Sequence, residues 1–158
     1  PQGLAFRPGT NDPYTAEHGP NINDEVNKLV NGGNAGWDPT NGSDYDQSKT
    51  MTDLLKFPSA MRPVWRSGDG GTIAPSGITF LSGSQWQSWD GALVMAILKN
   101  SELRVLLMNP DGSASGQFQM PSSGGTRLRS VVQGPDGNLY VATDGGGTSG
   151  AIWRVTPS

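Results

Sequence analysis

The sequence predicts an all-β fold of antiparallel sheets, and three observations carry this prediction. Short apolar segments follow one another at even spacing along the chain, polar turns separate them, and hardly any segment has helical character. Gly and Pro contribute 23 and 12 of the 158 residues, which suits a chain with many turns. Segments of this kind with turn residues between them are typical of antiparallel meanders.

The expected strands can be followed along the chain. Asp111-Gly112 and Asp136-Gly137 have the residue types that supply positive φ in tight hairpins. Residues 51–57 are a helical alternative of about two turns, which Pro58 would end. In chain order, the strands are expected at residues 3–6, 14–17, 76–81, 92–98, 103–109, 116–121, 127–133, 138–144 and 151–157.

Composition excludes several classes of partner. A length of 158 residues predicts a single domain, 1–158, and the net charge of −3 provides no basic field for nucleic acid or an anionic membrane. No apolar run approaches the roughly 18 residues of a membrane span, and no signal segment opens the chain. The absence of cysteine excludes disulfides and thiolate metal sites. Because the sequence starts at Pro1 and not at Met, we expect that an upstream segment was removed.

A weak internal repeat sharpens the fold prediction. Residues 2–19, 76–100 and 129–146 share an apolar strand, a glycine-containing turn and a second apolar strand that ends in a polar loop. Repeated small sheets of this kind are typical of a β-propeller. The strand count predicts about three blades of four-stranded antiparallel sheet, which is a partial propeller, because complete rings have four to eight blades.

Seven fragments in register resemble a known family. They are "PQGLAF", "EHGPNINDEVN", "GGNAGW", "APSG", "LKN", "RLRSV" and "GPDGNLYVATD". In this order they resemble the C-terminal half of the soluble pyrroloquinoline-quinone (PQQ)-dependent glucose/sorbosone dehydrogenases, and the match is weakest over residues 38–69. The resemblance implies one half of a six-bladed propeller that binds PQQ and calcium, acts on a sugar, and is secreted or periplasmic.

The resemblance implies five cofactor-binding side chains. His18 would lie beside the quinone, and Thr72 would lie over it, although the tryptophan of the family next to this threonine is Gly70 here. Cations would bind the three carboxylates of PQQ, and two arginines separated by one residue on a strand point the same way. The set is His18, Thr72, Lys99, Arg127 and Arg129.

The resemblance also implies two calcium sites. The carbonyls of Gly19 and Pro20 would hold the calcium of the cofactor, and Glu25 with the carbonyl of Ala35 would form a second, structural site. Calcium prefers oxygen donors of this kind, including backbone carbonyls.

Considered without the resemblance, the same residues have ordinary interpretations. His18 would be a solvated loop residue, Lys99 a turn lysine, and the two arginines an exposed strand face. Asp24 and Glu25 would be surface charges. "NGGNAGW" would be a glycine turn with Trp37 packed in the core, also within the family.

Two functional hypotheses remain. In the family, the catalytic base is a histidine on an earlier blade, oriented by an aspartate, and an arginine-asparagine pair directly precedes the position of Pro1. All of these lie outside this sequence, so we expect no sugar oxidation by this chain alone, and we assign no catalytic residue to it. The chain is either half of a PQQ-dependent dehydrogenase or a non-catalytic half-propeller that binds or assembles with an inherited calcium site. Both hypotheses predict a partner, either the N-terminal half of the propeller or a second copy in a homodimer.

Overall fold

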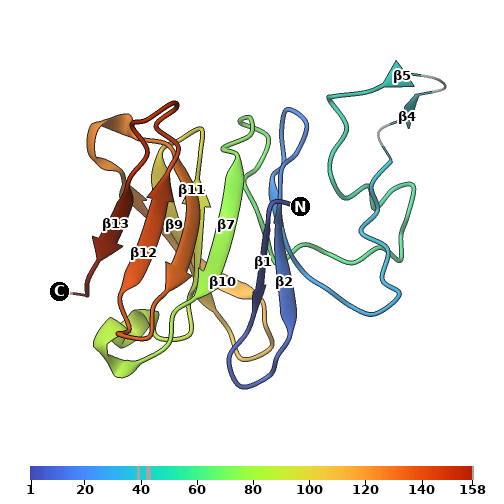
Figure 1. Cartoon of the computed structure of the whole chain (residues 1–158). Helices are drawn as coiled ribbons and strands as arrows, with labels where there is room; N and C mark the ends of the chain where they lie inside the picture. The colour runs from blue at the N-terminus through green and yellow to red at the C-terminus, as the bar shows by residue number, and fades with distance from the viewer. Residues whose placement is uncertain (39, 42–43, 158) are drawn as a thin grey trace.

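Three antiparallel sheets lie side by side in the computed structural model, which describes residues 1–38, 40–41 and 44–157 (Figure 1). One strand of each sheet belongs to a row of inner strands, in which β1 (Gly3–Phe6) packs against β7 (Pro75–Phe80) and β7 packs against β11 (Leu128–Gln133). The predictions of an all-β fold and of three sheets are confirmed.

The strand order follows the chain within each sheet. The first sheet has the order β1-β2-β3-β6, with β2 (Pro13–Glu17), β3 (Glu25–Lys28) and β6 (Trp65–Arg66). The second has the order β10-β9-β8-β7, with β8 (Leu93–Ile97), β9 (Glu102–Met108) and β10 (Ala114–Pro121). The third has three strands among the described residues, β11-β12-β13, with β12 (Leu139–Thr143) and β13 (Ile152–Val155). Short β4 (Thr40–Asn41) and β5 (Asp44–Tyr45) form a separate pair, and two 3-10 segments are η1 (Ser84–Trp89) and η2 (Ser123–Gly125).

The inner strands approach one another so closely that two positions require glycine. A Cβ on Gly3 would lie 2.3 Å from the carbonyl oxygen of Ser76, and a Cβ on Gly77 would lie 2.8 Å from the Cα of Ser130. Both obstacles are backbone atoms, which cannot turn aside as a flexible side chain can. Glycine therefore sets the spacing between neighbouring sheets.

The core consists of two layers, one on each face of the second sheet. All five residues of β8 are buried, and they alternate between the layers. Leu93, Met95 and Ile97 pack towards the first sheet, whereas Val94 and Ala96 pack towards the third. This burial on both faces explains why β8 has a continuous apolar sequence instead of an alternating one.

Three local predictions can be compared with the structure. Gly112 and Gly137 have φ of 92° and 79°, which confirms the positive φ expected at the two Asp-Gly turns. Residues 51–57 form turns and no helix: the Asp53 side chain caps the Leu55 and Lys56 amides and the Phe57 amide donates to the Asp53 carbonyl, but the chain turns away before Pro58 and adds no further helical turn. The expectation of Trp37 in the core is wrong, since this side chain is only partly buried in the wall of a cavity.

Two strands of the first sheet were not among the expected strands. β3 carries the polar sequence Glu-Val-Asn-Lys, and β6 has only two residues. Between them lies a long excursion that includes β4 and β5 and stands away from the sheets in Figure 1. No helix in the described part of the chain is long and apolar enough to span a membrane.

Candidate functional site

The residues assigned to PQQ and calcium gather at one end of the sheets, which we call the rim. The start of each inner strand pairs with the end of the next strand, as in the pairing of Gly3 with Ala16. The close contacts between neighbouring inner strands show that their starting ends lie level with one another. Loops that precede β1, β7 and β11 or follow β2, β8 and β12 therefore share the rim.

Asp24 organises the part of the rim that belongs to the first sheet. Its side chain is completely buried, and its Oδ1 accepts hydrogen bonds from the Gly19 amide at 2.9 Å and the Thr72 hydroxyl at 2.5 Å. Its Oδ2 accepts from the amides of Ile73 at 2.5 Å and Ala74 at 3.2 Å. The interpretation of Asp24 as a surface charge is wrong, because the loops before and after it enclose the carboxylate.

The Gly19 loop can have only glycine at its first turn. A Cβ at Gly19 would lie 1.7 Å from the carbonyl oxygen of Ile22. The following loop residues connect to the Thr72 segment, since the Thr72 amide donates to the Asn21 carbonyl at 2.8 Å. Gly19 and Thr72, which the resemblance placed on calcium and on PQQ, are therefore joined in one hydrogen-bonded unit, and Pro20 follows Gly19 directly.

Lys99 belongs to the same unit through its backbone. Its amide donates to the Ile73 carbonyl at 3.1 Å, and the Leu98 amide donates to the Ala74 carbonyl at 3.0 Å. Its side chain is exposed, so the ammonium group extends from a fixed turn. Beside Thr72, Gly70 is exposed and has open space around a built Cβ, where the resemblance led us to expect a tryptophan.

Glu25, Ala35 and His18 line one cavity of about 230 Å³ at the rim. Trp37 and Glu17 contribute to the same wall. Glu25 is 1% exposed, so the interpretation of this residue as a surface charge is also wrong. His18 is only partly exposed, and its Nε2 is buried and has no hydrogen-bond partner among the described residues.

The surroundings of Glu25 fit a cation. Its Oε2 accepts hydrogen bonds from the Thr52 hydroxyl at 2.8 Å and the Asn27 amide at 3.4 Å, whereas its buried Oε1 has no partner among the described residues. Burial raises the pKa of the Glu25 carboxyl above its usual value, and the hydrogen bonds from Thr52 and Asn27 offset part of this increase. A calcium ion with Glu25 Oε1 and the Ala35 carbonyl as ligands would relieve both the orphaned oxygen and the buried charge.

This candidate calcium site depends on mixed ligands. Within the described residues there is no cluster of three or more His, Cys, Asp or Glu side chains that could hold a metal ion. Carbonyl oxygens must therefore contribute, as the resemblance implies for Gly19, Pro20 and Ala35. Calcium accepts such ligands readily, whereas metals that prefer nitrogen or sulfur do not.

Arg127 and Arg129 form a cationic pair on the rim of the third sheet. Arg127 directly precedes β11 and Arg129 lies in it, and both contact the same carboxylate oxygen, Asp144 Oδ2, at 3.4 and 2.7 Å. Their shared partner confirms that they point to the same side, and their side chains are 51% and 49% exposed. Hydrogen bonding from Arg129 is the main cause that lowers the pKa of Asp144, and Arg127 adds to it.

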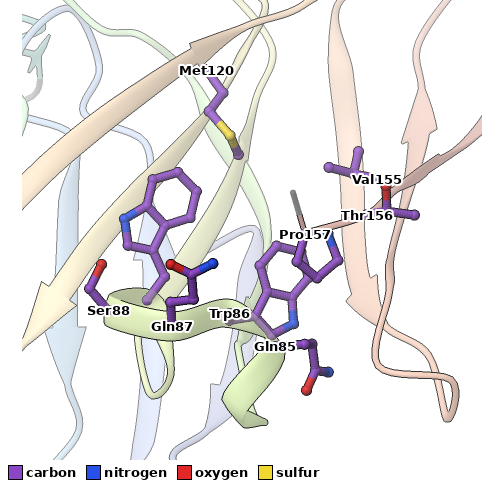
Figure 2. A pocket seen from close by; sticks show the side chains of 9 residues that line it. Gln85, Trp86, Gln87, Ser88, Met120, Val155, Thr156 and Pro157 are labelled. Carbon is purple, nitrogen blue, oxygen red and sulfur yellow. The ribbon is translucent and has the colours of Figure 1, made fainter.

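A second hollow, of about 260 Å³, lies away from these residues (Figure 2). Trp86 and Gln87 of η1 line one side, Met120 of β10 lies above them, and Thr156 and Pro157 line the opposite side. Its lining contains no charged residue, so it offers neither the cations nor the carboxylate that the rim provides. It adjoins the end of β13, the last strand of the three-stranded sheet.

Three contributors to the site were missed by sequence reasoning. Asp24, Thr52 and Asp144 hold candidate residues in place, but none of them is itself a candidate contact. The Gly-Pro loop "EHGPNIN" before Asp24 was a weak signal, because a tight loop next to a strand needs groups that accept its free amides. Thr52 offered no signal, since 27 residues separate it from Glu25.

The three level sheets and the rim of oxygen and cation groups define the class of protein, a partial β-propeller with a candidate cofactor site at one end. The sequence model described as Glucose / Sorbosone dehydrogenase matches residues 1–154, and the chain belongs to this family. A solved structure named glucose dehydrogenase superposes with a TM-score of 0.80 at 28% identity and covers 100% of this chain and 44% of that chain. The predictions of the family and of a partial propeller are confirmed.

Two curated relatives give the comparison in sequence. The aldose sugar dehydrogenase YliI of Escherichia coli is 32% identical over 159 residues, which are 99% of this chain and 42% of the relative. The quinoprotein glucose dehydrogenase B of Acinetobacter calcoaceticus is 31% identical over 86 residues, which are 54% of this chain and 17% of the relative. The chain thus spans less than half the length of these relatives.

Proposed function

We propose that this chain supplies the cofactor-binding, C-terminal half of a six-bladed, PQQ- and calcium-dependent aldose dehydrogenase. The observation that carries the proposal is the convergence at one rim of the Gly19 loop, Thr72, Lys99 and the Arg127–Arg129 pair. The similarity to proteins named aldose sugar dehydrogenase and quinoprotein glucose dehydrogenase supports it.

Each group has a task that matches its chemistry. When bound, PQQ would supply the hydride acceptor for oxidation of the sugar. Arg127 and Arg129 hold carboxylates of the cofactor with charge-assisted, partly bidentate hydrogen bonds, and Lys99 adds a flexible positive charge. The Gly19 and Pro20 carbonyls bind the calcium ion of the cofactor, and Glu25 with the Ala35 carbonyl binds a second calcium ion that ties the excursion to the first sheet.

Proton removal from the sugar is assigned to a group outside this chain. A catalytic base must come within hydrogen-bond distance of the substrate hydroxyl. His18 Nε2 is buried and has no hydrogen-bond partner among the described residues, so this nitrogen does not face open solvent. We therefore propose that His18 is not the base, and the family resemblance is what places it beside the cofactor.

Activity after mixing tests the proposal. The chain is combined with the N-terminal half of the Escherichia coli relative, PQQ and calcium, and reduction of a dye by aldoses is followed. We expect PQQ-dependent reduction only when both halves are present. Reduction by the chain alone, or no reduction although the two halves form a complex that binds PQQ, would contradict this division of tasks.

A second candidate function is a non-catalytic half-propeller that retains the calcium site. One observation favours it: the arginine pair already has an anionic partner in Asp144, so it does not need a ligand to neutralise its charge. This candidate predicts that calcium raises the melting temperature Tm of the chain, whereas PQQ leaves Tm unchanged. The thermal scan with each ligand separates the two candidates.

We further propose that the chain assembles with a partner that covers its outermost sheets. Large apolar side chains are exposed on the first sheet, with Leu4 57% and Phe6 58% exposed, and on the third, with Val132 56% and Ile152 74% exposed. The outer edge of β13 adds a strand without a described neighbour, and such edges pair readily with another strand. The N-terminal half of the propeller or a second copy in a two-fold dimer fits this need.

Light scattering at micromolar concentration tests the partner proposal. We expect twice the chain mass, or a complex with the N-terminal half when that half is present. A folded monomer that persists in both conditions would refute it. From the family resemblance, we also propose a periplasmic or secreted location, which fractionation of the producing cell would test.

A further inference from the structure

Asp24 is a fully buried carboxylate that connects loops of two different sheets. It is 0% exposed, and no Lys, Arg or His nitrogen within the described ranges forms an ion pair with it. Burial of a carboxylate without a cation is costly unless hydrogen bonds satisfy its oxygens. Four donors do so here, two on each oxygen.

These donors come from two loops that are distant in sequence. The Gly19 amide belongs to the loop after β2, whereas the donors on Thr72, Ile73 and Ala74 precede β7. The backbone of Asp24 makes a third connection, since its amide donates to Ser67 Oγ at 3.0 Å and its carbonyl accepts from the Ser67 amide at 2.9 Å. One side chain thus joins the first sheet to the second at the rim.

The connection extends to a third candidate contact. The Ile73 amide donates to Asp24, and the Ile73 carbonyl accepts from the Lys99 amide. Ala74, held by the same oxygen, has a φ of 60°, a region that alanine seldom adopts, and its carbonyl accepts from the Leu98 amide. The carboxylate therefore controls the backbone on which the Lys99 turn rests.

We infer that Asp24 is the positioning residue of the rim site, which holds the Gly19 carbonyl, the Thr72 side chain and the Lys99 turn in one arrangement. The inference rests on the proposed function for what these groups bind, but not for the arrangement itself. Asp24 acts through these residues, and its own oxygens are occupied by donors from the protein.

The chemistry of the four donors makes it possible to break one of these hydrogen bonds selectively by substitution. Asp24→Asn keeps the size of the side chain, but its amide NH₂ must face one pair of donors. The Thr72 hydroxyl can reverse and accept a hydrogen bond, whereas the Gly19 amide cannot. The asparagine is therefore expected to keep Ile73 and Ala74 on its oxygen and to release Gly19 selectively.

The experiment measures amide hydrogen exchange and ligand affinity on the full chain. For Asp24→Asn we expect at least about tenfold faster exchange at Gly19, little change at Ile73, and an affinity for calcium and PQQ at least about tenfold weaker, because a hydrogen bond to a charged group is lost. The matched control is Asp111→Asn. It removes a carboxylate that accepts from the Ser113 amide and hydroxyl at 2.8 and 2.7 Å, in the hairpin at the opposite end of the second sheet, and should leave all these values unchanged.

The outcomes separate this inference from the proposed function. Unchanged exchange at Gly19, or unchanged affinity where the wild-type chain binds either ligand, would overturn the role of Asp24. If the wild-type chain binds neither calcium nor PQQ, the proposed function fails, and exchange at Gly19 alone decides whether Asp24 positions the loop. If Asp24→Asn does not fold, Ser67→Ala loosens only the backbone of Asp24. Faster exchange at Gly19 in that variant would support the inference, and no change would refute it.

Discussion

The rims of the first and third sheets hold their charged groups in opposite ways. On the first sheet, Asp24 and Glu25 are buried and are held by hydrogen bonds from loops of distant sequence position. On the third sheet, Arg127 and Arg129 are half exposed and share a single carboxylate, Asp144. The first arrangement fixes the positions of its groups, whereas the second leaves two positive charges exposed to an anionic ligand.

The difference shows how the two regions would bind their ligands. Buried polar groups with fixed donors are costly to rearrange, so the first sheet suits a cation that requires defined distances. Exposed arginines lose little when they exchange one carboxylate for another, so the third sheet suits an anionic group of the cofactor. Four changes test this comparison, and they follow in order of decreasing effect.

The largest effect is expected from the arginine pair. Replacement of both Arg127 and Arg129 by Gln should weaken the affinity for PQQ by more than about a hundredfold, since each charged hydrogen bond contributes roughly 1.5–3 kcal/mol. His18→Ala should weaken PQQ binding by less than about tenfold, because a single imidazole contact contributes less than two arginines. Calorimetric titration measures both, and equal losses would show that the assigned roles are wrong.

The second effect concerns the fixed geometry of the first sheet. Gly19→Ala would place a Cβ 1.7 Å from the Ile22 carbonyl oxygen, so the loop must open, at a cost of about 3 kcal/mol of unfolding free energy. Gly116→Ala in β10 is the control, because its Cβ would meet only the Leu107 side chain at 3.9 Å. Urea unfolding compares the two variants. A Gly19→Ala protein as stable as the control would show that the loop is not rigid.

The third effect is stabilisation by calcium. Millimolar calcium should raise Tm relative to chelator, by an amount that corresponds to about 2.7 kcal/mol at one hundred times the dissociation constant. Glu25→Gln should remove most of this increase in Tm, because the amide is neutral and an NH₂ group can take the place of the unpartnered Oε1 that would bind calcium. Thermal scans with and without calcium give the answer. An equal Tm with chelator and with millimolar calcium in the wild-type chain would refute the calcium site.

The smallest effect concerns pH and the third sheet. The two arginines lower the pKa of Asp144 below its usual 3.8, so its ionised form stabilises the folded chain above that value, and the contribution is lost as the pH falls through the lower folded pKa. Asp144→Asn should therefore lower Tm slightly at neutral pH, and the gap should close below pH 3.8. Because the groups are exposed, added salt should also reduce the gap. A gap that grows in acid would contradict this sign.

Much of the fold could be predicted because the signals are local. Residues 3–6 and 139–143, for example, are apolar segments next to glycine turns, and both form strands at nearly the expected bounds. β3 could not be predicted in this way, because its polar side chains are buried against partners of distant sequence position, such as Thr52 in the excursion and Glu17 in β2. The helical alternative at 51–57 is not formed: Asp53 caps two amides as at the start of a helix, but only a single turn follows before Pro58.

By itself, the sequence determined the all-β class, the three repeated sheets and the family, and it nominated the candidate site residues, which stay predictions; each of these depends on residue type and order along the chain. Only the tertiary structure decided that Asp24 and Glu25 are buried, that Asp24 joins Gly19 to Thr72, and that Asp144 connects Arg127 with Arg129. The physical reason is that burial and hydrogen-bond partners depend on which loops meet in space. Asp24 and Thr72 are 48 residues apart, and no local pattern brings them together.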